Sequence, residues 1–172
     1  MIVLGLDPGL ATTGYGLIKE EKGKIELVDY GCIKTKAEDS HVARLLSLYE
    51  GFEALLQEGK PDAVALEKLF FNQNTKTALQ VGEARGVIML GIAKKKKPLF
   101  EYTPLQVKQA VTGYGRASKQ QIQRMVKNIL NLPRVPTPDD AADALAVAIC
   151  QCHFHNFETT LETALERDTL IR

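Results

Sequence analysis

The chain is poor in cysteine, and it lacks any long apolar run. Three cysteines among 172 residues are an odd number, which argues against a disulfide framework and favours a reducing cytoplasm. No uncharged apolar stretch approaches the ~18 residues of a membrane span. The first residues, MIVLGLDPG, carry no basic region before their apolar run ends at Asp7. We therefore expect no secretion signal and no membrane partner.

The chain also has little net charge, but its charges are unevenly distributed. The total is +1, from 22 basic and 21 acidic residues. Residues 94–127 nevertheless hold nine basic residues and one acid, which favours a polyanionic partner such as nucleic acid. A solvated helix end explains the run KKKK, at residues 94–97, equally well. It explains less well the three basic residues around a glycine-rich turn, which are Lys108, Arg116 and Lys119.

The composition is that of an ordered globular protein, with 45% hydrophobic and 25% charged residues. Hydrophobic periodicity predicts three strands, then helix, strand, helix, strand and further helices. The strands are expected at 2–7, at two places within 15–34, at 62–67 and at 98–103. The helices are expected at 40–59, 74–95, 103–111, 118–130 and 138–153. This order predicts one α/β domain over residues 1–155, whose later strands run parallel to the first. The polar tail, 156–172, is expected to fray.

Two carboxylates stand where predicted strands end. Asp7 closes the first strand, and Glu67 closes the strand at 62–67. Neighbouring parallel strands would bring both to one carboxyl edge, which is where open α/β sheets bind ligands. Strand alternation places Ala63, Ala65 and Glu67 on one face. A carboxylate at such a place is costly to desolvate unless it is paired or bound to metal.

The stretch PTPDDAADALA, residues 136–146, adds three more acids at the start of a helix. One interpretation is simple capping, with Thr137 as N-cap and the acids at the positive end of the helix dipole. The other is a metal site, because Asp140 and Asp143 lie on one helix face while Asp139 points elsewhere. Four converging carboxylates require a cation, and their hard oxygens suit two Mg²⁺ or Mn²⁺ ions about 4 Å apart. The run CQCHFH, at 150–155, has the wrong spacing for zinc.

Four separated motifs resemble, in order, the bacterial RuvC Holliday junction resolvases. These are GLDPGLATTGYG, LEKLFFNQNTKTALQVGEARG, QVKQAVTGYGRASKQQIQRMV and DDAADALAVAICQCH, which together cover the chain from residue 1 to about 155. The resemblance implies a ribonuclease H-like fold, with a mixed five-stranded sheet flanked by helices. It also implies a Mg²⁺-dependent endonuclease that acts as a homodimer on four-way junction DNA, in recombination and repair, beside the RuvA–RuvB branch-migration complex.

The resemblance assigns roles to individual residues. The dimer interface is expected along the helix at 74–95, and some family members have histidine where this chain has Asp140. The aromatic wedge against a junction base corresponds to Phe70, with Phe71 as a second candidate. Lys108 and Lys119 are expected to contact DNA, and Arg116 belongs to the same basic turn. The catalytic and metal-binding acids are expected to be Asp7, Glu67, Asp140 and Asp143.

Three other functions remain open at the level of sequence. A ribonuclease H-fold nuclease of the YqgF type, acting on another nucleic acid, would share the opening strand, but the long helix and DDAADALA argue against it. Sugar kinases and actin-like ATPases share a GxDxGTT turn, but they need a second domain for which 172 residues leave no room. A DNA-binding structural protein with an inert site would have no reason to keep four acids.

Overall fold

The structure is a computed structural model that describes residues 1–68 and 75–169, with side chains described for 1–68 and 78–155. Its order of elements is the predicted one. The strands are β1 (Ile2–Asp7), β2 (Thr12–Glu21), β3 (Lys24–Lys34), β4 (Ala63–Glu67) and β5 (Leu99–Tyr102). The helices are α1 (His41–Gly59), α2 (Thr75–Lys94), α3 (Pro104–Thr112), α4 (Lys119–Ile129) and α5 (Asp139–Thr169).

The strands form one mixed sheet in the order β3-β2-β1-β4-β5. The first three strands are antiparallel neighbours. β4 joins β1 in parallel, and β5 joins β4 in parallel. This arrangement confirms the prediction that strands reached through helical crossovers run parallel to the first strand.

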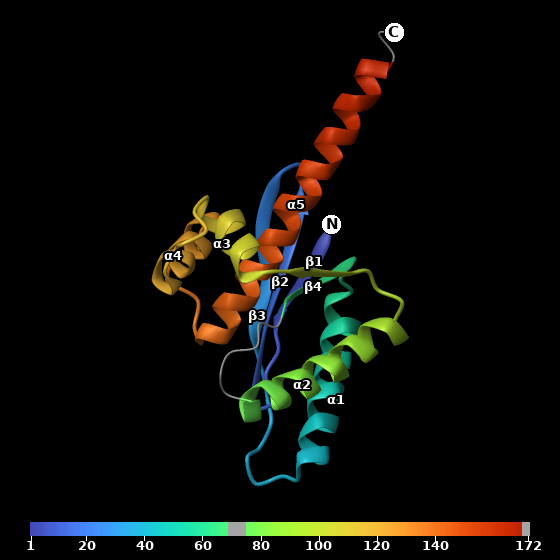
Figure 1. Ribbon diagram of the computed structural model, residues 1–172, viewed down its shortest axis with the longest axis vertical. Coiled ribbons are helices and arrows are strands. Elements are labelled where there is room, and N and C mark those ends of the chain that lie inside the picture. The colour runs from blue at the N-terminus through green and yellow to red at the C-terminus, as the bar shows by residue number, and fades with distance from the viewer. Residues whose placement is uncertain (69–74, 170–172) are drawn as a thin grey trace.

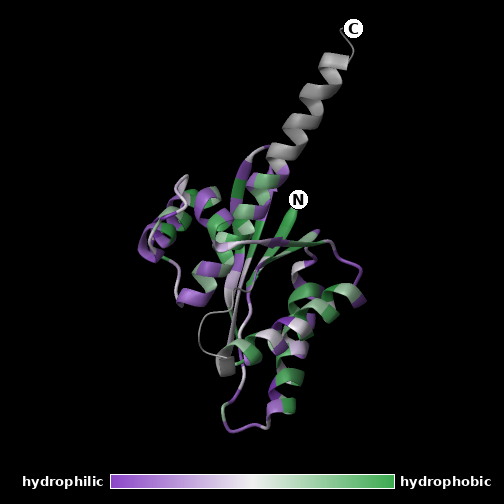
Figure 2. Cartoon of the chain, in the orientation of Figure 1, coloured by the Kyte–Doolittle hydropathy of each residue, from purple (hydrophilic) through white to green (hydrophobic). Residues whose placement is uncertain are grey.

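Helices cover both faces of the sheet (Figure 1). Alternation along β1 divides the core in two: Leu4 and Leu6 pack with α1 and α2, and Val3 packs with α3, α4 and α5. Figure 2 shows hydrophobic residues along the strands and along α5 where it crosses them. Because Gly5 and Asp7 share a face with Val3, the carboxylate that ends β1 lies on the α5 side.

Helix α5 lies directly on the strands at two glycines. A Cβ at Gly5 would overlap the Ala144 carbonyl oxygen, and a Cβ at Gly14 would overlap the carbonyl oxygen of Asp140. Only hydrogen fits at these positions, so the backbone of α5 approaches β1 and β2 more closely than a side chain would allow. The first turns of α5 are thereby set beside the end of β1.

Both ends of α5 differ from the sequence prediction. The helix begins at Asp139, and the Pro138 carbonyl oxygen accepts hydrogen bonds from the amides of Ala141 and Ala142. Thr137 is therefore not the N-cap, because the helix starts one residue later than its cap would require. At the other end the helix does not stop near His153 but continues to Thr169. No glycine or proline interrupts residues 154–169, and glutamate, leucine and alanine in that stretch favour a helix.

Candidate active site

Asp7 and Glu67 end two adjacent parallel strands. Their neighbours Leu6 and Leu66 are paired in the β1–β4 register, so both carboxylates leave the sheet at the same edge. Asp7 also stands opposite Gly14 of β2, the glycine on which the first turn of α5 rests. This contact brings Asp140 and Asp143 to the edge where the strand-end acids lie. The structure thus places at one edge of the sheet the four acids that the sequence singled out.

The electrostatics of Asp7 show how closely the acids are grouped. Burial, followed by the negative charges of Asp143, Glu67 and Asp140, raises the pKa of Asp7 from 3.8 to about 7. Burial and Asp143 also raise the pKa of Glu67, which Lys108 partly lowers. Charging these groups together is costly because they share a poorly hydrated edge. A cation would offset that cost.

Asp143 already contacts a cation, the Lys119 ammonium. Lys119 is the first residue of α4, and its Nζ lies 2.9 Å from Asp143 Oδ2. A second ion pair joins the same Nζ to Asp139 Oδ2 at 3.3 Å. A lysine at a helix start is unfavourable for the dipole, and these two carboxylates compensate it.

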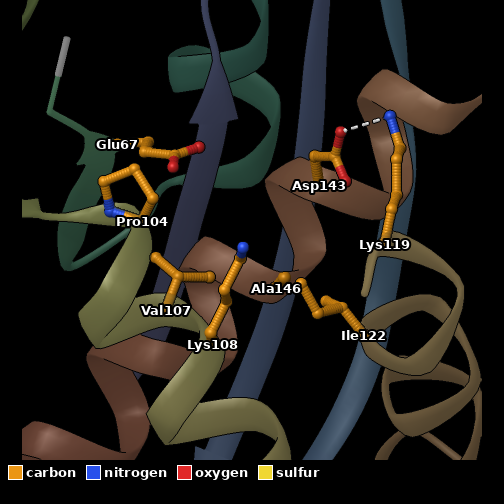
Figure 3. Close-up of a pocket in the computed structure, with 8 residues that line it drawn as sticks. All are labelled: Glu67, Pro104, Val107, Lys108, Lys119, Ile122, Asp143 and Ala146. Atoms are coloured by element: carbon orange, nitrogen blue, oxygen red, sulfur yellow. Dashed lines mark ion pairs between the residues drawn. The ribbon is translucent and has the colours of Figure 1, made fainter. Parts of the chain in front are cut away.

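A cavity of about 200 Å³ opens between these groups (Figure 3). Lys108 of α3 and Lys119 of α4 contribute its two basic side chains, and Glu67 and Asp143 its two acids. The helices that carry the lysines each start with a capping box, formed by Thr103 with Gln106 in α3 and by Ser118 with Gln121 in α4. The full lining is Glu67, Pro104, Val107, Lys108, Lys119, Ile122, Asp143 and Ala146.

The remaining sequence candidates lie elsewhere. Arg116 is exposed in the turn between α3 and α4 and does not line the cavity. The side chain of Asp139 is 65% exposed. This exposure agrees with the expectation that Asp139 lies outside the cluster of acids. Phe70 and Phe71 lie outside the described residues. Cys150 and Cys152 are buried in the core, where burial raises the pKa of each thiol to about 12.

Sequence reasoning missed one residue that supports the site, Arg85 of α2. Its side chain is buried, and Nη1 donates a 2.6 Å hydrogen bond to the backbone carbonyl oxygen of Glu67. The same guanidinium is paired with Glu101 of β5. Arg85 therefore ties α2 to the ends of β4 and β5. The sequence signal that could have identified Arg85 is its position as a charged residue on the inner face of an apolar helix, because a buried charge needs a specific partner.

A mixed sheet of this order, with acids at the ends of β1 and β4 and on a helix across them, defines a nuclease of the ribonuclease H-like class. The family described as "Crossover junction endodeoxyribonuclease RuvC" matches residues 3–153. The chain belongs to this RuvC family, which confirms the resemblance seen in its four motifs.

Individual relatives are similar to this chain over nearly its whole length. The RuvC of Alkaliphilus oremlandii is 57% identical over 157 residues, which are 91% of this chain and 96% of that protein. The Thermus thermophilus RuvC structure is 34% identical, with a TM-score of 0.85, and covers 92% of this chain and 98% of its own. The structure titled "T. thermophilus RuvC in complex with Holliday junction substrate" is 32% identical, with a TM-score of 0.87 and coverage of 92% and 97%. This membership decides against the YqgF-type, kinase-like and inert alternatives.

Proposed function

We propose that this protein resolves four-way DNA junctions by cutting two opposed strands with a divalent metal at the Asp7, Glu67, Asp140 and Asp143 cluster. The observation that carries the proposal is the grouping of these acids at one buried edge: burial, and then the charges of Asp143, Glu67 and Asp140, raise the pKa of Asp7 to about 7. The structure of a relative of 32% identity shows that relative in complex with a Holliday junction substrate. The basic lining of the adjacent cavity, Lys108 and Lys119, offers phosphate contacts.

The donor chemistry of the cluster fits a hard cation. Carboxylate oxygens are the ligands that Mg²⁺ and Mn²⁺ prefer, and no histidine–cysteine set for zinc accompanies them in the described residues. In the same described part of the chain no three such side chains stand close enough to hold an ion jointly. We infer that entry of the metal draws the carboxylates together. Asp7, Glu67, Asp140 and Asp143 would hold two Mg²⁺ ions, with Mn²⁺ as a substitute, and the bound metal would supply activation of water and stabilisation of the leaving oxygen.

We also propose a homodimer formed through the outer face of α2. Leu79 and Leu90 are 65% and 60% exposed there, and a Cβ added at Gly82 or Gly86 would meet nothing. A two-fold dimer suits a junction of approximate two-fold symmetry, since each site then meets an equivalent strand. Action beside the RuvA–RuvB complex is proposed from the family resemblance.

The proposed setting is the cytoplasm, which the three free thiols favour. None of the helices in the described part of the chain combines the length and apolar character that a bilayer crossing needs.

The decisive assay offers the protein a synthetic four-way junction, duplex, RNA–DNA hybrid and single strand side by side. With Mg²⁺, we expect paired symmetric nicks in the junction alone. Asp7→Asn should abolish cutting and leave junction binding intact in metal-free buffer, because it removes a metal ligand but no phosphate contact. Equal cutting of all four substrates would contradict the junction assignment. Undiminished nicking by Asp7→Asn would remove Asp7 from the catalytic cluster.

A further inference from the structure

Under the proposed function Lys119 has two partners, a carboxylate and a DNA phosphate, and a single ammonium group cannot fully compensate both at the same time. In the structure its Nζ lies 2.9 Å from Asp143, an acid of the proposed metal site. The proposed function also gives Lys119 a phosphate of the junction as its partner. A lysine that contacts a carboxylate has its charge compensated there, so it attracts a phosphate less strongly. Likewise, a carboxylate paired with lysine is a poorer metal ligand.

The surroundings of Lys119 allow it to move between these partners. Its side chain is 52% exposed, at the start of α4 and on the rim of the cavity. Asp139, 65% exposed and 3.3 Å away, is a second carboxylate that stands outside the metal cluster. Leaving Asp143 therefore does not strand the ammonium without a partner, because Asp139 and solvent remain within reach.

We propose that Lys119 acts as an exchangeable internal cation: it occupies Asp143 in the free protein and gives way when a divalent ion binds, which releases it to a DNA phosphate. This inference rests on the proposed function, and it adds a coupling between metal and DNA. Metal binding frees Lys119 for the phosphate, and phosphate binding frees Asp143 for the metal. By linkage, each ligand strengthens the other by the same factor.

Lys108 provides a matched control within the same cavity. It lines the same cavity as Lys119 and lowers the pKa of Glu67 through its charge. In the described structure, however, Asp143 has its ion pair with Lys119 and none with Lys108. Replacing Lys108 therefore removes one positive charge from the cavity but leaves the ion pair between Lys119 and Asp143 in place. Both lysines are on the surface of well-capped helices, so both variants are expected to fold.

The first test measures Mn²⁺ affinity without DNA, from the loss of the free-ion electron paramagnetic resonance signal. Lys119→Met should bind Mn²⁺ about three- to fivefold more tightly than the parent, the range expected from removing one partly exposed ion pair. Lys108→Met should change the affinity by less than about twofold. Equal affinities for the parent and Lys119→Met, or equal gains in the two variants, would overturn the exchange.

Asp7→Asn separates failure of this inference from failure of the metal site itself. If the cluster holds metal, Asp7→Asn loses Mn²⁺ binding whatever Lys119 does. A parent protein that binds no Mn²⁺, or one whose binding is unaffected by Asp7→Asn, would overturn the metal-site proposal and the exchange with it. Loss in Asp7→Asn without gain in Lys119→Met would overturn only the exchange.

The second test measures the coupling directly, as junction affinity by fluorescence anisotropy with and without Ca²⁺, with intact DNA verified on a gel. In the parent, Ca²⁺ should strengthen junction binding through both charge neutralisation and release of Lys119. In Lys119→Met only the first effect remains, so the Ca²⁺-dependent gain should be smaller. An identical gain in the two proteins would contradict the proposed release.

Discussion

At the scale of single residues, Asp7 shows that the candidate site reduces the stability of the folded protein. Burial on the α5 side of the sheet, and then the charges of three other acids, raise the pKa of Asp7 from 3.8 to about 7. A carboxyl group whose pKa is raised by folding binds its proton more tightly in the folded chain than in the unfolded one. Its ionisation therefore reduces stability as pH rises from about 4 to about 7.

We predict that Asp7→Asn is more stable than the parent at pH 8 in metal-free buffer, by about 2 kcal/mol after discounting for solvent and for shared repulsion. Urea denaturation in chelator should show this difference shrinking as pH falls and levelling off below about pH 4, as the Asp7 carboxyl becomes protonated in the unfolded parent as well as in the folded one. Added Mg²⁺ should stabilise the parent selectively. A difference that is constant from pH 4 to pH 8 would show that the repulsion is not its source.

At the scale of elements, the candidate site depends on how α2 is joined to the sheet. Arg85 spans from the inner face of α2 to the Glu67 carbonyl oxygen at the end of β4, and it pairs with Glu101 of β5. The helix is also tied to α1, where the His41 imidazole and Glu83 carboxylate lie 2.8 Å apart. The backbone that carries Glu67 is thereby held from the side opposite α5.

We predict that Arg85→Met lowers Mn²⁺ affinity at least tenfold, because the backbone of Glu67 loses its donor and the acid loses its fixed position. The loss of a buried hydrogen bond should also cost about 1–3 kcal/mol of stability. Glu101→Gln is the matched control, since it removes the ion pair but keeps Arg85 available to Glu67. Arg85→Lys should recover part of the affinity. Equal Mn²⁺ affinities in Arg85→Met and Glu101→Gln would show that the contact with Glu67 has no positioning role.

At the scale of the whole molecule, the outer face of α2 is the proposed surface of the homodimer. Leu79 and Leu90 are large exposed apolar residues on a helix whose opposite face is buried. Such a face is stabilised when a second apolar surface covers it.

We predict that Leu90→Arg converts the protein to a monomer, as measured by sedimentation equilibrium, because the charge cannot be buried against a second copy. The monomer should retain its fold but lose the pairing of nicks on opposed strands. Val28→Arg is the control, since Val28 is 52% exposed on β3, away from α2. A dimer that persists in Leu90→Arg, or dissociates equally in Val28→Arg, would place the interface elsewhere.

Much of this architecture could be predicted from the sequence, because it depends on local patterns. The expected parallel pairing of the first strand with the strand at 62–67 placed Asp7 and Glu67 at one edge, and the spacing of Asp140 and Asp143 placed them on one helix face. The helix expected at 118–130 is present as α4, where Ser118 and Gln121 form a capping box. The contacts that complete the site depend on residues far apart in the sequence. Neither the approach of α5 to Gly14 nor the pairing of Lys119 with Asp143 has a local signal.

Because α5 approaches β2 so closely at Gly14, a substitution at Gly14 and a substitution at Asp7 would damage the protein in two different ways. A side chain at Gly14 would push against the Asp140 backbone, so such a chain loses its packing and is removed as an unfolded protein. A chain with asparagine at position 7 keeps its packing and, under the proposed dimer, pairs with intact copies. In a cell that makes both versions, the first lesion would be recessive. The second would be dominant, since each mixed dimer could cut only one of the two strands.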